Sequence, residues 1–301
     1  MSTPDLLRLL ALGAIWGASF LFGRVTSPVL GAAPVAFCRI ALAAVGLIVL
    51  VLAQRVPLDF RGRFRTVLLL GVVSSGLPFL MFGFAAQYLP AGYSAIFNAT
   101  TPLMGILMGA LAFQEPATPA KLGGVVTGLF GVFVLTRAGP LAMTPPVLLA
   151  VGACLVATAC YGLSAHLTKR WIGQRGGLDS RLLSLGSQLG ALIMLLPAFV
   201  WHEATTPVAW SAITPGVWGA LLALGLLCTG LAYVLYYQLL ATVGPIKATT
   251  VTFVVPFFGV LWGAIFLQEQ LSLGHALGGG LIALALWLVL KPSAPARLAA
   301  A

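Results

Sequence analysis

Pro, Gly and charged residues divide the sequence into apolar runs that are each about as long as a lipid bilayer is thick. A transmembrane helix needs about 20 mainly apolar residues. Because 60% of the chain is hydrophobic and only 7% is charged, against about 25% charged in a soluble domain, these runs cannot form the core of a soluble fold. We predict an all-α integral membrane protein with ten transmembrane helices, near 6–25, 34–53, 66–88, 91–112, 120–137, 146–168, 181–200, 216–240, 245–267 and 272–290.

The basic residues gather on one side of the membrane if the chain alternates sides from a cytoplasmic N-terminus. Membrane proteins keep Lys and Arg in their cytoplasmic loops. Arg24 and Arg137 fall at the opposite ends and Arg39 lies just inside the second helix. Thirteen basic residues fall on or near the cytoplasmic side: Arg8, Arg55, Arg61, Arg63, Arg65, Lys121, Lys169, Arg170, Arg175, Arg181, Lys247, Lys291 and Arg297. We therefore predict an even number of spans, both termini in the cytoplasm, and a location in the bacterial inner membrane.

The second half of the chain repeats the first at a constant spacing of 154 residues. The pair Gln114-Glu115 returns as Gln268-Glu269, a match that is less common in membrane helices than a match of Gly or Ala. Seven identities fall within 23 positions, where Pro102, Gly105, Gly109, Ala110, Gln114, Glu115 and Gly124 match Pro256, Gly259, Gly263, Ala264, Gln268, Glu269 and Gly278. This regularity indicates an internal duplication.

Each copy of the duplicated unit contains five predicted helices. Because five is an odd number, the second copy must enter the membrane from the opposite side. We assign the first repeat to residues 1–138 and the second, inverted repeat to residues 144–291. Inverted repeats are typical of transporters that work by alternating access.

The duplicated unit carries a motif in which Pro is followed by twelve residues, Glu and then a Gly pair. Its residues are Pro102, Glu115, Gly123 and Gly124 in the first copy and Pro256, Glu269, Gly278 and Gly279 in the second. This duplicated pattern resembles the EamA repeat of the drug/metabolite transporter superfamily, over about residues 6–290. The resemblance implies a substrate cavity between the halves, lined by helices 1, 3, 4, 6, 8 and 9. Among the subgroups, the YddG-like exporters of neutral and aromatic amino acids look closest.

Several function classes are excluded by the residues that the chain lacks. The net charge of +10 comes from short stretches between helices rather than from a basic face with interleaved aromatic residues, so nucleic acid is not an expected partner. There is no HExxH, GxSxG, His cluster or mid-membrane aspartate pair for catalysis, and the four cysteines lie in apolar runs without metal-binding spacing. We expect no enzyme activity, no metal and no cofactor.

Acidic residues are absent from the middle of every predicted span. The six are Asp5, Asp59, Glu115, Asp179, Glu203 and Glu269, all in loops or at helix ends. Proton or sodium coupling usually relies on a carboxylate buried in the membrane. Our hypothesis is that transport is uncoupled or exchange-like. Glu115 and Glu269 are open to two interpretations, as gating or coupling acids or as fixed helix ends.

Three other ionisable residues, Arg39, Lys247 and His166, lie nearest to membrane depth. For Arg39 and Lys247 the expectation is that the long side chain snorkels to the interface, and His166 is expected to be interfacial. The alternative for Lys247 is contact with an anionic group such as a substrate carboxylate.

Candidate substrate-binding residues combine a polar stripe on the fourth helix with aromatic residues near mid-span. A carboxamide such as that of Asn98 needs several hydrogen bonds, and aromatic walls suit an apolar side chain. Packing between small polar residues and the interfacial aromatic belt are the structural alternatives. The predicted binding residues are Trp16, Ser19, Phe79, Ser94, Asn98, Thr101, Tyr161, Tyr233, Lys247 and Thr252.

Pro102 and Pro256 interrupt the fourth and ninth predicted helices at equivalent places. A proline removes one backbone hydrogen bond and can kink a helix. We predict that these two residues act as hinges, with a static kink as the alternative.

The predicted function is transport of small metabolites across the bilayer, with neutral or aromatic amino acids as the first expectation. Other small nonpolar metabolites or drugs form the alternative substrate class, and an intramembrane enzyme is the alternative function class. Sugar phosphates would require several basic residues in the cavity. The expected partners are the lipid bilayer and a small-molecule substrate, and the protein is expected to be a monomer.

Overall fold

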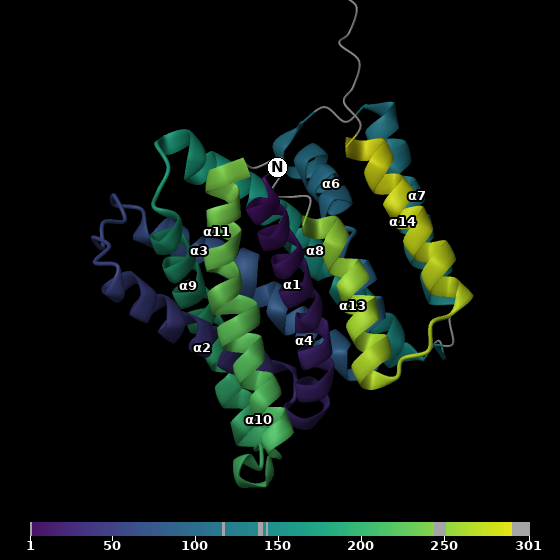
Figure 1. The fold of residues 1–301 in the computed structure, drawn as a ribbon, viewed down its shortest axis with the longest axis horizontal. Coiled ribbons are helices and arrows are strands. Elements are labelled where there is room, and N and C mark those ends of the chain that lie inside the picture. Colours follow the sequence, from purple (N-terminus) through teal and green to yellow (C-terminus); the bar gives the residue numbers. More distant parts are fainter. Residues whose placement is uncertain (1, 116–117, 138–140, 143, 244–250, 291–301) are drawn as a thin grey trace, which may run out of the picture.

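The computed structural model describes residues 2–115, 118–137, 141–142, 144–243 and 251–290 (Figure 1). Nearly all of these residues are helical, and the described part contains no strand. Six helices are long and apolar enough to cross a membrane, and the bent pair Ala91–Asn98 and Thr101–Phe113 forms a seventh candidate span. The chain is therefore an all-helical, multi-pass membrane protein.

The helices of the first half agree with the expected spans to within a few residues. They are α1 (Thr3–Leu30), α2 (Ala32–Ala53), α3 (Phe64–Gly71), η1 (Val72–Gly76), α4 (Leu77–Tyr88), α5 (Ala91–Asn98), α6 (Thr101–Phe113) and α7 (Pro119–Arg137). Segment η1 is π-helical and joins α3 to α4 without a break. Gly31 separates α1 from α2 with a φ of 84°, a backbone conformation that glycine adopts without strain.

The second half is also made of helices at the expected spans. They are α8 (Pro145–Trp171), α9 (Ser180–Thr205), α10 (Pro215–Leu222), η4 (Ala223–Leu231), α11 (Ala232–Val243), α13 (Val251–Leu267) and α14 (Leu273–Leu290). Segment η4 is again π-helical and continuous with its neighbours. The first residues of the ninth expected span lie outside the described part of the chain. From Val251 onward that span is helical.

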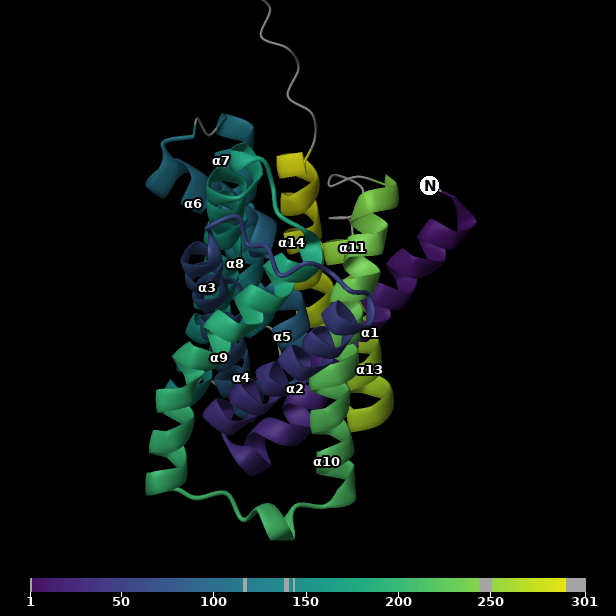
Figure 2. The same ribbon diagram turned by 90° about the vertical axis from the view of Figure 1, so that its left-hand side faces the viewer.

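Helices from the two halves pack against one another rather than as separate bundles. Helix α1 packs against α13, α8 packs against α4 and α6, and α2 packs against α9. Helices α7 and α14 form a pair at one side of the molecule, away from α2, α3 and α9 (Figures 1 and 2). The space between the halves is therefore bordered by helices far apart in the sequence.

Close helix contacts depend on glycine where α6 crosses α8. A Cβ atom added to Gly162 would lie 2.6 Å from the backbone nitrogen of Gly105. Small residues allow membrane helices to approach in this way. The largest buried cluster lies nearby and includes Tyr93, Phe97 and Leu103. It fixes α5 and α6 against α7, α8 and α14.

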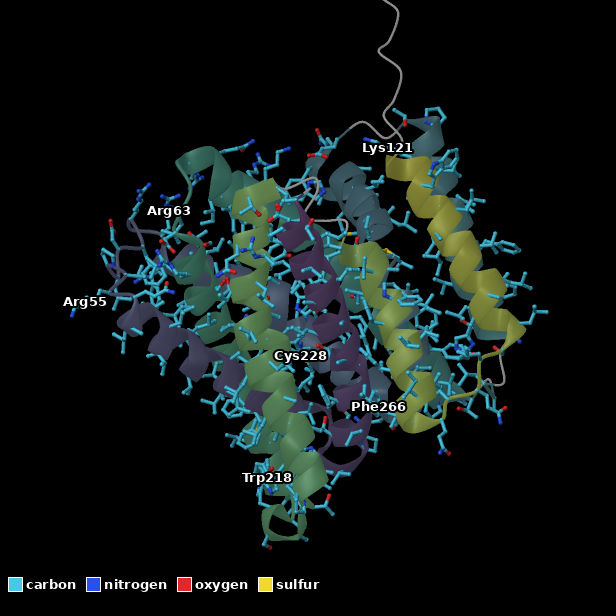
Figure 3. The ribbon with its side chains drawn as sticks, viewed as in Figure 1. Arg55, Arg63, Lys121, Trp218, Cys228 and Phe266 are labelled. Atoms are coloured by element: carbon cyan, nitrogen blue, oxygen red, sulfur yellow. The ribbon has the colours of Figure 1, made fainter. Side chains whose placement is uncertain are left out.

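The outer surface of the bundle is apolar. Leu111, Val126 and Trp201 are 71%, 68% and 72% exposed, as expected for side chains in contact with lipid tails. In the view of Figure 3, Arg63 and Lys121 lie in the upper half of the molecule and Trp218 lies in the lower half. Arg63 and Lys121 thus lie toward the end of the bundle opposite Trp218.

The two predicted hinge prolines occupy different places in their helices, although they match in the sequence repeat. Helices α5 and α6 are bent by 41° at a break that comes before Pro102, and Pro102 occupies the first turn of α6, where a proline is well tolerated. Pro256 lies inside α13, which continues through it. Pro256 thus lies within a continuous helix, and its role as a hinge stays a prediction.

Candidate functional site

A cavity of about 690 Å³ lies between the two halves of the bundle. Its wall includes residues of α1, α2, α4, α5, α8, α9, η4, α11 and α13. Cavities of about 300–1,000 Å³ are typical of small-molecule sites. This cavity is large enough for a metabolite of the size of an aromatic amino acid.

The cavity is closed at one end and reaches the surface at the other. Ser27, Leu89 and Ala91 line one end and are buried. Ala165 and Lys169 line the opposite end and are exposed. We refer to these as the Ala91 end and the Lys169 end.

Most of the residues predicted to bind substrate lie around this cavity. Nine of them line it: Trp16, Ser19, Phe79, Ser94, Asn98, Thr101, Tyr161, Tyr233 and Thr252. Lys247 lies outside the described residues. The polar stripe and the mid-span aromatic residues thus face one space, although they come from seven different helices.

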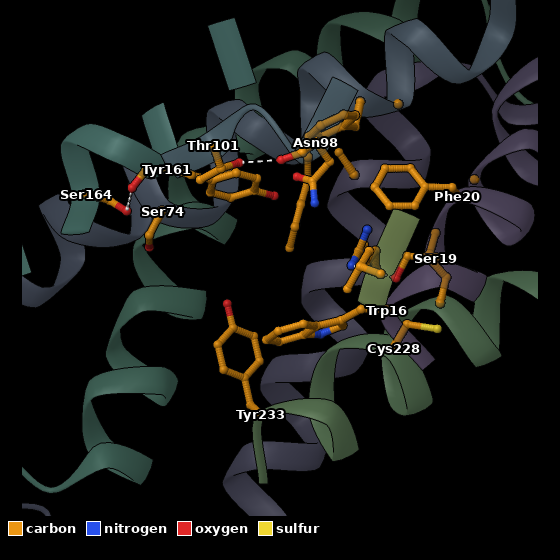
Figure 4. A pocket seen from close by; sticks show the side chains of 18 of the residues that line it. Trp16, Ser19, Phe20, Ser74, Asn98, Thr101, Tyr161, Ser164, Cys228 and Tyr233 are labelled. Carbon is orange, nitrogen blue, oxygen red and sulfur yellow. Dashed lines mark hydrogen bonds between the residues drawn. The ribbon is translucent and has the colours of Figure 1, made fainter. Parts of the chain in front are cut away.

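Aromatic rings form much of the cavity wall. The ring of Phe20 meets that of Phe82 edge-on, with centroids 5.5 Å apart, and Phe82 stacks with Tyr161 at 6.3 Å. Trp16 lies 5.5 Å from the ring of Tyr236. Figure 4 shows the Tyr233 hydroxyl pointing between Trp16 and Tyr161. This wall can receive an apolar side chain while the phenol groups offer hydrogen bonds.

Asn98 lies at the break between α5 and α6. Its backbone carbonyl accepts a hydrogen bond of 2.7 Å from the Thr101 hydroxyl, which satisfies a group that the helix break frees. Its carboxamide points toward the centre of the cavity (Figure 4). A carboxamide provides both donors and acceptors, so it can bind either polar end of an amino acid.

Arg39 also lines the cavity, although sequence reasoning expected it to snorkel to the interface. It lies in the second turn of α2, and its Nε donates a hydrogen bond of 2.8 Å to the Thr229 hydroxyl of η4. Its guanidinium carbon lies 3.8 Å from the ring centroid of Phe79. The expectation of snorkelling is wrong because these contacts hold the side chain against the cavity wall. The sequence signal that could have placed Arg39 in the cavity wall is a charged residue within an otherwise apolar span.

His166 lies near the Lys169 end and contacts α6. Its Nε2 lies 2.9 Å from the carbonyl oxygen of Gly105. A carbonyl can only accept, so Nε2 carries the proton of this bond. Nδ1 lies 3.4 Å from a carboxylate oxygen of Glu115, which places this histidine beside the end of α6.

Glu269 binds the start of α5 at the Ala91 end. Its two carboxylate oxygens accept hydrogen bonds of 2.6 Å and 3.0 Å from the backbone N–H groups of Ala91 and Gly92. These N–H groups begin α5, and a helix N-terminus attracts negative charge. Sequence reasoning left the role of Glu269 open, and its bonding partners lie 178 and 177 residues away.

A sequence model of the EamA-like transporter family matches residues 5–137 and 148–291. The matches cover both halves of the chain and leave only short segments outside them.

Curated relatives also extend over most of the chain. Protein PecM of Dickeya dadantii (strain 3937) is 27% identical over 88% of this chain and 84% of its own length. The uncharacterized transporter YoaV of Bacillus subtilis (strain 168) is 23% identical over 92% of this chain and 93% of its own. A protein of Streptantibioticus cattleyicolor named "Probable terminal-alkyne amino-acid exporter" is 26% identical over 84% of this chain and 82% of its own.

One solved crystal structure superposes on nearly the whole molecule. The TM-score is 0.65, over 96% of this chain and 97% of the other, at 18% sequence identity. At this identity the likeness concerns the fold alone.

Proposed function

Because this chain belongs to the EamA-like transporter family, we propose that it carries neutral or aromatic amino acids across the bacterial inner membrane. The route is the cavity between two inverted five-helix repeats, which alternate in opening to either side. The protein acts as a transporter and not as an enzyme, in keeping with the names of its relatives.

The aromatic cavity is the single observation that carries the substrate proposal. Rings of Trp16, Phe82 and Tyr161 border a space of about 690 Å³, beside the carboxamide of Asn98. Apolar walls with a few polar groups suit a solute that has one apolar side chain and one polar end. The amino-acid exporter among the relatives supports this substrate class.

Ten spans in two inverted repeats, residues 1–138 and 144–291, form the framework of the proposal. The π-helical segments η1 and η4 support it, since Gly76 in η1 corresponds to Gly230 in η4 at the repeat spacing. Helix pairing supports it too, because α1 packs on α13 as α8 packs on α6. Such pairs are what a pseudo-two-fold axis in the membrane plane produces.

Both termini lie in the cytoplasm in this proposal, and the Lys169 end of the cavity opens there. The open end is lined by Lys169, and Arg170 and Arg175 come shortly after it in the sequence. Cytoplasmic loops are enriched in such basic residues. The described arrangement is then an inward-open state. Reporter fusions to either terminus should report a cytoplasmic location, and a periplasmic terminus would contradict the ten-span arrangement.

Transport in this proposal is driven by the substrate gradient. No carboxylate lines the cavity among the described residues, and membrane-buried carboxylates are the usual coupling groups. An imposed pH or sodium gradient should therefore leave the final accumulation in proteoliposomes unchanged. Uphill accumulation driven by either gradient would contradict this part of the proposal.

Uptake by proteoliposomes tests the substrate class directly. The panel contains labelled amino acids, a sugar, a sugar phosphate and the lipophilic cation tetraphenylphosphonium. We expect uptake of aromatic and other neutral amino acids above that of protein-free liposomes. Other small nonpolar metabolites or drugs are the alternative, because the walls are largely apolar. Transport of tetraphenylphosphonium without any amino acid would favour that alternative and overturn the proposal.

A further inference from the structure

Arg39 brings a positive charge into the cavity with only neutral groups around it. Its Nε donates to Thr229 at 2.8 Å, and one Nη lies 3.5 Å from the Ser19 hydroxyl. The ring of Phe79 lies across the guanidinium plane at 3.8 Å. None of these three neighbours carries a charge.

No acidic side chain of this protein can neutralise Arg39. All six Asp and Glu residues belong to the described part of the chain, and each forms its contacts elsewhere. Asp5 pairs with Arg8, Asp179 with Arg181, and Glu115 with His166. The backbone N–H of Arg61 binds Asp59, the indole of Trp210 binds Glu203, and the start of α5 binds Glu269.

The opposite half of the molecule makes the equivalent interhelix bond without a charge. There Nε2 of Gln188, in α9, donates a hydrogen bond of 3.2 Å to the Ser75 hydroxyl in η1. Ser75 and Thr229 are separated by the repeat spacing of 154 residues, so Gln188 corresponds to Arg39. A neutral carboxamide is sufficient to bridge these helices. The charge of Arg39 therefore exceeds what the packing of α2 on η4 requires.

A guanidinium has five N–H donors, and the two neutral hydroxyls beside Arg39 use only part of them. A charge at membrane depth is costly unless it is paired or hydrated. Carboxylates match the planar donor pair of arginine with two parallel hydrogen bonds. The remaining donors face a cavity whose other walls suit an apolar group.

We infer that Arg39 is the residue that binds the carboxylate of the transported substrate. This inference rests on the proposed function and adds its specificity determinant. Phe79 and Thr229 hold the guanidinium in place, and the aromatic rings of Trp16 and Tyr161 receive the rest of the solute. The cavity should then prefer solutes with a free carboxylate over their amides and should reject organic cations.

Binding to detergent-purified protein, measured by calorimetry, tests this inference apart from transport. The probes are L-phenylalanine, 3-phenylpropionate, L-phenylalaninamide and 2-phenylethylphosphonate. The variants are Arg39→Gln, which copies the neutral group of the other half, and Arg39→Lys, which keeps the charge. Arg137→Gln, on the exposed end of the outer helix α7, is the matched control.

We expect the wild-type protein to bind the two carboxylates about 10- to 100-fold more tightly than the amide, as for loss of a hydrogen bond to a charged group. Arg39→Gln should remove this difference, Arg39→Lys should keep part of it, and Arg137→Gln should keep all of it. A preference for carboxylates that survives in Arg39→Gln would overturn the inference. Tighter binding of the phosphonate than of the carboxylates, or no binding of any carboxylate, would also overturn it.

Uptake of L-phenylalanine by proteoliposomes separates the two proposals. Carboxylate binding that depends on Arg39, without uptake of any amino acid, would contradict the proposed function and leave the inference standing. Uptake that is equal in wild-type protein and Arg39→Gln would contradict the inference and leave the function standing. Thermal unfolding of each variant distinguishes a loss of binding from a loss of fold.

Discussion

The ends of α6 and α13 share a Gln-Glu pair and the same backbone geometry but have different side-chain partners. In each, a Gln with positive φ, 56° at Gln114 and 54° at Gln268, ends the helix. The N–H of the following Glu then bonds a helix carbonyl, that of Gly109 at 3.0 Å in one end and that of Gly263 at 3.1 Å in the other. Local sequence alone accounts for this shared geometry.

The carboxylates of the two ends differ in what they bind. Glu269 accepts two N–H bonds from the start of α5 and so joins the halves at the Ala91 end. The Glu115 side chain is 50% exposed and contacts His166 at 3.4 Å, near the Lys169 end. The cavity is closed on the first side and reaches the surface on the second. The comparison teaches that a symmetric sequence motif takes part in an asymmetric state, as alternating access requires.

The largest effect is expected from Glu269→Ala, which removes the acceptor of both hydrogen bonds at the start of α5. A hydrogen bond to a charged group contributes about 1.5–3 kcal/mol. The closed arrangement of the Ala91 end should therefore lose about 3–6 kcal/mol of stabilisation, which increases the equilibrium constant for opening on the order of 100-fold or more. The measurement is the rate at which a membrane-impermeant maleimide labels Ser27→Cys, in protein whose native cysteines are replaced.

Glu115→Ala is the matched control for that experiment because the residue ends the equivalent helix. It should leave the labelling of Ser27→Cys unchanged, since the Glu115 side chain is 50% exposed and contacts of exposed charged groups contribute about 0–1 kcal/mol. Equal acceleration by the two substitutions would show that the observed asymmetry does not govern access at the Ala91 end.

A second comparison concerns Pro256, inside the continuous α13, and Pro102, in the first turn of α6. A proline within a helix costs about 3 kcal/mol, part of which neighbouring membrane helices relieve. Pro256→Ala should therefore raise the free energy of unfolding by about 1–2 kcal/mol and slow transport if bending of α13 is part of the cycle. Pro102→Ala should change stability much less. Thermal unfolding and uptake rates check both, and a larger gain from Pro102→Ala would reverse the assignment.

A third comparison concerns Asn98 and Thr252, which line the cavity at equivalent positions of the two halves. Asn98→Ala removes a carboxamide that points into the cavity, at a cost of about 1 kcal/mol, or about five-fold in the half-saturation concentration for uptake. Thr252→Val keeps the size of the side chain and should have a smaller effect. Both proteins should insert into the membrane normally. Unchanged half-saturation in Asn98→Ala would remove this residue from the binding site.

The smallest effects are expected from Gln114→Gly and Gln268→Gly. Both residues adopt the left-handed conformation, which costs a non-glycine residue about 1–2 kcal/mol, while added freedom of the unfolded chain offsets part of the gain. Each substitution should change the free energy of unfolding by less than about 1 kcal/mol, and by the same amount in both. Unequal shifts in thermal unfolding would show that the two helix ends differ in backbone strain as well as in partners.

The positions of the helices followed from the sequence because the length of an apolar run is a local property. The run from 34 to 53 became α2, and the run from 181 to 200 became α9. Periodicity also placed Ser94 and Asn98 on one face of α5, and both line the cavity. Pro256 remains inside α13, because a single proline does not decide whether its neighbours leave the helix, and its hinge role stays a prediction.

The sequence by itself determined a multi-pass helical membrane protein with a duplicated motif, because hydrophobicity and repeat spacing are written along the chain. Only the tertiary structure decided which end of the cavity is closed and where the charge of Arg39 lies. The bond from Arg39 to Thr229 joins residues 190 positions apart, and the bond from Ala91 to Glu269 joins residues 178 apart. Such contacts depend on which helices become neighbours, and the packing of the whole bundle determines that.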